Sequence, residues 1–315
     1  MQRSAIPYMD SLLAIEDHLG LELVEIEDWN CCGATEYSSI NRTASHALVG
    51  RNLALAEKMS NGANSLVAAC SACYLNLSKT DHYMQEDDIF NHRINDALSS
   101  GDLQYDPGSL DIRHALDVFY NDIGIEKIKE QVVKPLKGLR LAAYYGCMVV
   151  RPDVQDKFHD PEYPTVLEEL LEALGAEVVD FPMKTHCCSG HMTQISAETA
   201  YELIRRLIYG ATRYDADMLV TLCPMCQLNI DAYQNETNRF FKTNYQVPIL
   251  YFTQLIGLAF GIDPVKLGIG REFVDSRPAL AKIGVEIEEE LPIKKPKKKD
   301  GLPMPEMPAK NGRGD

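Results

Sequence analysis

The chain has 315 residues, a hydrophobic fraction of 45% and a formal net charge of −15 at pH 7. This length predicts about two domains, and the acidic charge argues against nucleic acid as a partner, because phosphates attract basic surfaces. No apolar run reaches the ~18 residues of a membrane helix and the N-terminus has no signal-peptide pattern, so we expect a cytoplasmic protein without a transmembrane segment.

Helices alternate with strands in the first half of the chain. The expected elements are a helix over 11–19, a strand over 21–27, a helix over 43–59 and a strand over 65–69. A cysteine motif follows each strand. The adjacent Cys31 and Cys32 precede Gly33, and Cys70-x-x-Cys73 follows the second strand.

The second half repeats this order after one additional strand. The expected elements are a strand over 139–145, a helix over 164–175, a strand over 176–181, a helix over 197–214 and strands over 217–222 and 248–252. A cysteine motif follows each of the first three of these strands. These motifs are Cys147, the pair Cys187–Cys188, and Cys223-x-x-Cys226.

The two halves also resemble each other in sequence. CSACYLNL (70–77) aligns with CPMCQLNI (223–230), and DHLGLELVEIE (17–27) aligns with EALGAEVVDFP (172–182). We therefore predict an α/β fold of two tandem repeats, each a small domain with a mostly parallel sheet and flanking helices. The predicted domains are 1–138 and 139–280, followed by a disordered, charged, proline-rich tail over 281–315. The run KKPKKK in that tail is read as solvated, with a docking element as the alternative.

All of the cysteines lie at or beyond the predicted carboxyl ends of strands. Ligands bind at this edge in open α/β sheets, so the thiols of one half should converge there. The first half has no counterpart of Cys147, which would fall before Met1. We therefore expect Met1 to be an internal methionine, with a further strand and a cysteine encoded upstream.

Converging thiolates repel one another unless cations lie among them. Adjacent cysteines chelate one small ion poorly, whereas each can bind a different iron of a polynuclear cluster. Iron–sulfur clusters are therefore the favoured interpretation, and zinc and thiol–disulfide redox chemistry are the alternatives. The CxxCxxC run of ordinary cubane ferredoxins does not occur in the sequence.

The complete cysteine pattern resembles the duplicated CCG motif of the family that includes the B subunit of heterodisulfide reductase. The resemblance implies two noncubane 4Fe–4S clusters that take part in reducing, or reversibly oxidising, a disulfide or related sulfur substrate. It also implies a ferredoxin-like C subunit with cubane clusters and a flavin-containing A subunit as partners. The implied ligands of one cluster are Cys147, Cys187, Cys188, Cys223 and Cys226. Those of the other, which lacks a fifth cysteine, are Cys31, Cys32, Cys70 and Cys73.

One motif departs from the family pattern, because the second repeat reads CCSGH. Gly190 is displaced by one residue, and we expect this to change a turn and no ligand. His186 and His191 flank the pair and are candidate proton donors, with ordinary loop histidines as the alternative. Asn76 and Asn229 follow the two CxxC motifs at matching places. Each could cap a helix or form hydrogen bonds near the cysteines, or it could simply lie on a helix surface.

Other side chains have simpler expected roles. Trp29 should shield the first cluster from water, and Tyr144 and Tyr145 should pack in the core rather than transfer protons. Without a GxGxxG or Walker loop, no nucleotide or flavin is expected on this chain.

Two alternative functions remain open from the sequence. One is an iron–sulfur electron-transfer or anchor subunit of a flavin dehydrogenase, of the succinate dehydrogenase, fumarate reductase, lactate oxidase or glycolate oxidase type. The other is a zinc-stabilised interaction module.

Overall fold

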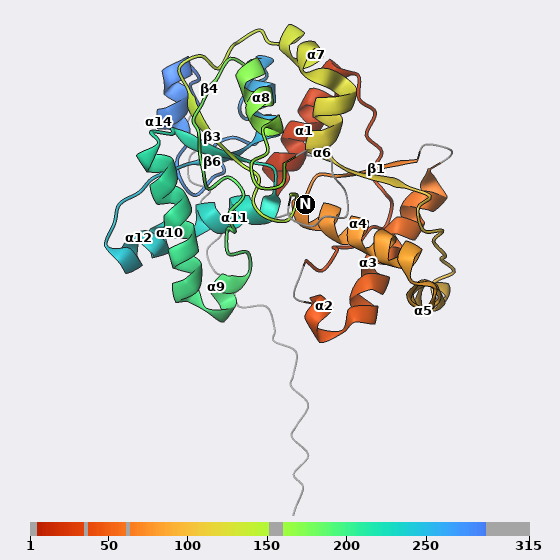
Figure 1. The fold of residues 1–315 in the computed structure, drawn as a ribbon. Helices are drawn as coiled ribbons and strands as arrows, with labels where there is room; N and C mark the ends of the chain where they lie inside the picture. The colour runs from red at the N-terminus through yellow and green to blue at the C-terminus, as the bar shows by residue number, and fades with distance from the viewer. Residues whose placement is uncertain (1–4, 35–36, 61–63, 151–159, 288–315) are drawn as a thin grey trace, which may run out of the picture.

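Two groups of parallel strands organise the protein, as the computed structural model shows over residues 5–34, 37–60, 64–150 and 160–287 (Figure 1). The first sheet pairs β1 (Ser65–Ala68) with β2 (Asp111–His114). The second has the order β4-β3-β5-β6, and every neighbouring pair is parallel. Its strands are β3 (Arg140–Tyr144), β4 (Glu177–Val178), β5 (Met218–Thr221) and β6 (Ile249–Tyr251). The predicted α/β fold with two tandem repeats is confirmed.

Helices flank both sheets. In the first half they are α1 (Ile6–Leu19), α2 (Tyr37–Ile40), α3 (Arg42–Met59), α4 (Ser71–Glu86), α5 (Asp88–Ser99), α6 (Ala115–Asp117), the π-helical turn Val118–Gly124 and α7 (Ile125–Glu130). In the second half they are α8 (Val166–Ala173), α9 (Met192–Ile195), α10 (Ala197–Arg213), α11 (Pro224–Ala232), α12 (Gln234–Phe241), α13 (Phe252–Ala259), α14 (Arg277–Leu280) and the short 3₁₀ helix Ala281–Ile283.

The helix α8 shows how the sequence pattern produces these elements. Apolar residues recur at helical spacing, and Val166, Leu167, Leu170 and Leu171 are all buried. The chain then enters Gly175 at φ +86°, a conformation that glycine adopts without steric cost, and the helix ends there. Most predicted elements are confirmed to within a few residues in this way.

The strand predicted over 21–27 is wrong. Residues 21–26 have no regular secondary structure, 27 and 28 form a turn, and Val24 is 72% exposed. The matching segment of the second half contains β4, which forms only because Glu177 and Val178 pair with β3. In the described part of the chain, no strand lies beside residues 21–27 as β3 lies beside β4. The backbone of residues 21–27 therefore has no sheet partner. The strand predicted over 176–181 is likewise shorter than expected.

The two halves share a continuous hydrophobic core. Helix α1 packs against α13 and α7 packs against α8, so two helices of the first half contact helices of the second. Tyr8 stacks on Tyr251 at 4.4 Å between ring centroids, and Phe119 meets Phe252 edge-on. The two repeats thus pack on each other through one shared core, and the boundary at 138 stays a prediction.

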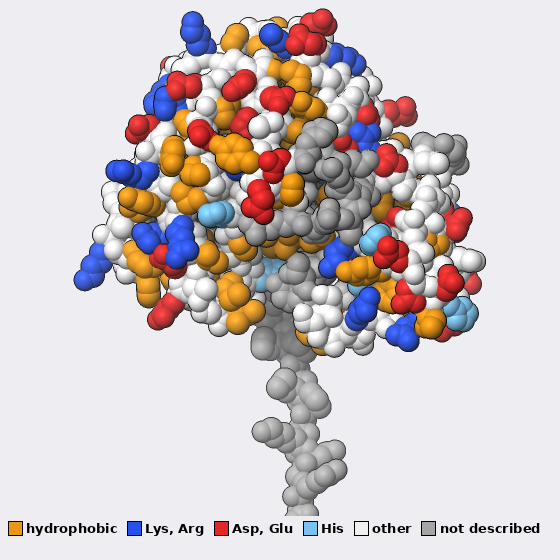
Figure 2. Space-filling view, in the orientation of Figure 1, with side chains coloured by type: hydrophobic (Ala, Val, Ile, Leu, Met, Phe, Trp, Pro, Cys, Tyr) orange, Lys and Arg blue, Asp and Glu red, His pale blue; other side chains and the backbone are white. Residues whose placement is uncertain are grey.

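The first residues of the predicted tail belong to the described structure. Residues 281–287 are described, and the side chains of Ile283, Val285 and Ile287 pack against the core because they are apolar. The rest of the predicted tail, 288–315, lies outside the described residues. Acidic and basic side chains are interspersed over the face in Figure 2. None of the helices in the described ranges is both long and apolar enough to cross a membrane.

Candidate metal centre

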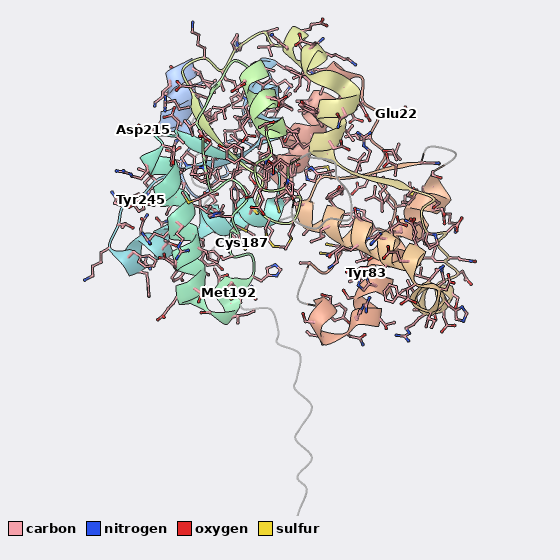
Figure 3. All side chains as sticks on the ribbon, viewed as in Figure 1. Glu22, Tyr83, Cys187, Met192, Asp215 and Tyr245 are labelled. Carbon is pink, nitrogen blue, oxygen red and sulfur yellow. The ribbon has the colours of Figure 1, made fainter. Side chains whose placement is uncertain are left out.

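Five thiols of the second half gather around one cavity. The cavity has a volume of about 120 Å³, enough for several water-sized groups, and lies in the region of the labelled Cys187 (Figure 3). Three separate segments supply the thiols, as the strand topology predicts. The cysteines that line it are Cys147, Cys187, Cys188, Cys223 and Cys226.

Local backbone structure positions these thiols. Cys223 lies two residues after the end of β5, at the N-cap position of α11, whose first residue is Pro224. Cys147 follows β3 through Gly146, which has φ +70°. A Cβ atom at position 146 would lie 3.0 Å from the Cys226 sulfur, so glycine is required both for the turn and for the close approach of the backbone to this thiol.

The four cysteines of the first half have a matching arrangement. Cys31 is exposed and Cys32 is buried, just as Cys187 is exposed and Cys188 is buried. The Cys32 and Cys73 sulfurs lie 3.4 Å apart. Cys70 follows β1 and caps α4, as Cys223 caps α11. The structure therefore brings together Cys32, Cys70 and Cys73 of the first repeat, as it does the five thiols of the second.

The two sets of cysteines also meet each other. Hydrogen bonding to Cys223, and then to Cys73, raises the pKa of the Cys70 thiol. The sequence did not predict this contact between the CxxC motifs of the two halves. It joins the sets into one continuous sulfur-rich region, because Cys70 also packs with the residues of the second-half core.

The thiols differ in how readily they ionise. Hydrogen bonds from Cys32 and Cys70 lower the pKa of Cys73 to about 4, and hydrogen bonds from Cys226 and Cys70 hold the pKa of Cys223 well below its usual value. The pKa values of the donor thiols are raised in turn. One thiolate in each half is thus favoured by the protein alone, and further thiolates require positive charge, which bound metal would supply.

Cysteines line the wall of a cavity here and do not surround one point. Among residues 5–34, 37–60, 64–150 and 160–287, no group of three or more His, Cys, Asp or Glu side chains has the arrangement that holds a metal ion. A structural zinc ion takes four ligands, whereas the irons of a polynuclear cluster can share five cysteines among them. Five soft thiol donors around one cavity fit an iron–sulfur cluster better than a zinc ion.

Asn76 and Asn229 tie the helices after the CxxC motifs to the paired cysteines. The Asn76 amide donates to the Ala34 carbonyl at 2.5 Å. The Asn229 amide donates to the Cys188 carbonyl and, at 2.7 Å, to the Ser189 hydroxyl. Of the two roles left open by the sequence, the structure supports hydrogen bonding near the cysteines in both repeats.

Replacing Asn229 with alanine should lower the free energy of unfolding by about 1–3 kcal/mol, because it leaves the buried Cys188 carbonyl without this donor. Asn76→Ala is the matched control in the other repeat. Its effect should be smaller, since Asn76 is only half-buried whereas Asn229 is buried. Urea denaturation of both variants measures the difference, and equal losses would contradict this account.

The CC turn itself keeps its shape in both repeats, which corrects one expectation. Gly33 and Ala34 have φ of +74° and +52°, and Ser189 and Gly190 have +72° and +48°. Both turns therefore contain two consecutive left-handed residues, with glycine first in one repeat and second in the other. Ser189 tolerates this strained conformation with its hydroxyl bonded to the Asn229 amide.

The two candidate histidines lie in different places. His191 lines the cavity, whereas His186 is exposed and is not among the lining residues. The His186 carbonyl instead accepts a hydrogen bond from the buried Tyr144 hydroxyl at 2.7 Å. Trp29 is partly buried, and its indole N–H donates to Glu25 at 2.8 Å.

Residues that the sequence did not single out hold the Cys147 turn. The Lys184 carbonyl accepts the N–H groups of Tyr145 and Gly146 at 2.9 and 3.0 Å. The Lys184 ammonium, 3% exposed, pairs with Glu168 at 2.7 Å, and Glu168 also accepts the Tyr145 hydroxyl at 2.6 Å. An isolated lysine within PMKTHCC has no spacing signal, so only the folded structure shows this network.

Comparisons with known proteins identify the family of the cysteine-rich repeats. The family model described as a CCG cysteine-rich domain matches residues 2–78 and 141–231. A membrane anchor subunit of 8-methylmenaquinol:fumarate reductase from Wolinella succinogenes is 34% identical over 276 residues, which cover 88% of this chain and 94% of that protein. The B subunit of ferredoxin:CoB-CoM heterodisulfide reductase from Methanosarcina mazei is 31% identical, covering 84% of this chain and 88% of that protein.

Two further similarities extend the comparison. A protein from Archaeoglobus profundus, named as similar to the B subunit of heterodisulfide reductase, is 32% identical, covering 82% of this chain and 86% of that protein. The crystal structure of a hypothetical protein from Helicobacter pylori has a similar fold, with a TM-score of 0.66 and 15% identity, covering 85% of this chain and 49% of that one. From the duplicated motif, the matched family model and these relatives, the chain belongs to the CCG cysteine-rich domain family that includes the B subunit of heterodisulfide reductase.

Proposed function

We propose that this chain is the iron–sulfur catalytic subunit of a cytoplasmic heterodisulfide reductase-like complex. The observation that carries the proposal is the gathering of five thiols from three chain segments around one cavity. The relatives named as the B subunit of heterodisulfide reductase, or as similar to it, support the proposal. The second-half cluster would be held by Cys147, Cys187, Cys188, Cys223 and Cys226. The first-half cluster would be held by Cys31, Cys32, Cys70 and Cys73. Both clusters are proposed to be of the noncubane 4Fe–4S type.

The proposed reaction converts one disulfide, two electrons and two protons into two thiols. Bound iron–sulfur clusters would supply electrons one at a time. The electrons are proposed to come from a ferredoxin-like C subunit with cubane clusters, fed by a flavin-containing A subunit. The contact of Cys70 with Cys223 brings the two cysteine sets next to each other, which supports a substrate shared between two clusters.

The side chains of this protein would fix and protonate the reacting groups. Lys184, Glu168 and Tyr145 hold the Cys147 turn, and Asn229 holds the CC turn. His191 lies on the cavity wall, where its imidazole could give a proton to a departing thiolate. His186 lies outside the cavity lining, and its protonation role is the weaker of the two proposals.

A second function is favoured by one observation, the relative from Wolinella succinogenes named as an anchor subunit of fumarate reductase. In that case the same cysteines would pass electrons between a flavoprotein and another carrier without binding a sulfur substrate. A zinc-stabilised module is a third candidate, and its support is weaker because five cysteines line one cavity, one more than the four ligands of a structural zinc site.

The experiment uses the complex purified without oxygen, with reduced methyl viologen as the electron donor. We expect two thiols to form for each disulfide consumed, and the preparation to contain iron and acid-labile sulfide. Free thiols are counted with a chromogenic reagent. Reduction of fumarate by the complex without any thiol formation would favour the anchor function, and zinc without acid-labile sulfide would favour the third.

A further inference from the structure

A serine from the first half lines the cavity of the second-half cysteines. Ser71 directly follows Cys70 and is the first residue of α4. The residue is 1% exposed. Its hydroxyl oxygen is buried and has no hydrogen-bond partner in the part of the chain that the structure describes. Burying a hydroxyl without a partner costs free energy, so a ligand of the cavity is a natural acceptor for it.

The position of Ser71 removes one acceptor that a serine further along a helix could use. A serine inside a helix can donate to the carbonyl of the preceding turn, but Ser71 begins α4 and has no preceding helical turn. The same position adds a preference for negative charge. The first N–H groups of this 16-residue helix have no intrahelical acceptor, and the helix dipole is positive at this end.

The corresponding residue in the other repeat has no such donor. CSAC (70–73) aligns with CPMC (223–226), so Pro224 takes the place of Ser71. Proline has no side-chain hydroxyl and no N–H group. The duplicated cysteine sets are therefore chemically unequal, and the first repeat contributes a hydroxyl to the cavity of the second.

We propose that the Ser71 hydroxyl donates a hydrogen bond to an anionic sulfur held in this cavity. The inference rests on the proposed function, which supplies two sulfur anions of this kind. One is the thiolate released from a disulfide that has taken up two electrons, and the other is the inorganic sulfide of a cluster. Both carry negative charge next to the same five cysteines, and hydrogen bonding at Ser71 stabilises either one.

The test compares Ser71→Ala with two controls. Ser71→Thr keeps the hydroxyl. Ser78→Ala removes a second buried serine hydroxyl of α4 that also has no partner in the described structure but does not line the cavity. Each protein is prepared without oxygen, and iron and sulfide contents equal to those of the wild type show that the variant is loaded. The electron paramagnetic resonance spectrum is then titrated with 2-mercaptoethanol as the thiolate probe, and the reduction potential is measured without thiol.

Two results would support the proposal and identify the anion. If the anion is the thiolate, Ser71→Ala should bind 2-mercaptoethanol about ten- to a hundredfold more weakly, the range expected for a lost hydrogen bond to a charged group. If it is inorganic sulfide, the reduction potential of Ser71→Ala should fall, because the hydrogen bond favours the more negative, reduced state. Ser71→Thr and Ser78→Ala should behave like the wild type in both measurements.

Unchanged binding and unchanged potential in Ser71→Ala would overturn the proposal, as would equal changes in Ser78→Ala. Failure of the proposed function is seen separately in the wild type, as iron–sulfur protein that neither responds to thiolate nor forms thiols from a disulfide. Even then, the reduction potential of Ser71→Ala tests whether the Ser71 hydroxyl donates to an inorganic sulfide.

Discussion

Replacing Cys188 with alanine should remove about half of the iron and acid-labile sulfide from protein prepared without oxygen. Cys188 is 4% exposed and lines the cavity, and its thiol is hydrogen-bonded to the Cys226 thiol. Alanine has no thiolate, so the second-half cluster would lose one of its five proposed ligands. The metal of the first half should remain, since its four cysteines are untouched. Disulfide reduction should be lost.

The matched variant in the other repeat is Cys32→Ala, which removes the buried cysteine next to Cys73. It should also remove about half of the iron, and the double variant should hold almost none. Iron, sulfide and zinc are measured on the same samples, and circular dichroism shows whether the variants are folded. Full iron content in Cys188→Ala, or zinc without acid-labile sulfide in the wild type, would contradict the proposed ligand sets.

The gathering of the cysteines could be predicted from the sequence because it depends on few physical rules. Alternating helices and strands imply parallel sheets, and the carboxyl ends of parallel strands meet at one edge. Cys147 and Cys223 directly follow β3 and β5, which are neighbours in the sheet. The positions of the motifs after the strands therefore predicted that their cysteines would lie close together, even though the segments are far apart in the chain.

Features that depend on contacts between distant segments could not be predicted in this way. The strand expected over 21–27 has apolar and β-branched residues, but a strand needs a neighbour to pair with, and periodicity does not reveal whether one exists. The role of Lys184 depends on Glu168 and on the backbone of Tyr145, which meet it only in the fold. The contact between Cys70 and Cys223 likewise arises from the packing of the two repeats.

The packing of the two repeats depends strongly on one aromatic side chain at the start of the chain. Tyr8 in α1 is fully buried, stacks on Tyr251 at an interplanar angle of 9°, and meets Phe252 edge-on. Its hydroxyl lies 3.5 Å from the carbonyl of Leu222, the residue before Cys223. A helix of the first repeat thus supports the strand end that presents a thiol of the second.

Tyr8→Ala should lower the free energy of unfolding by about 3–5 kcal/mol, the usual cost of deleting a large buried aromatic side chain. The cavity would open at the contact of α1 with Tyr251, so the backbone before Cys223 would lose support and metal binding should weaken as well. Leu13→Ala is the control, because Leu13 lies on the same helix but is 50% exposed, and its effect should stay below about 1 kcal/mol. Tyr8→Phe should retain most of the stability, since the stacking surface remains and only a long hydrogen bond is lost. Urea denaturation measures all three variants, and equal effects of Tyr8→Ala and Leu13→Ala would show that α1 does not join the two repeats.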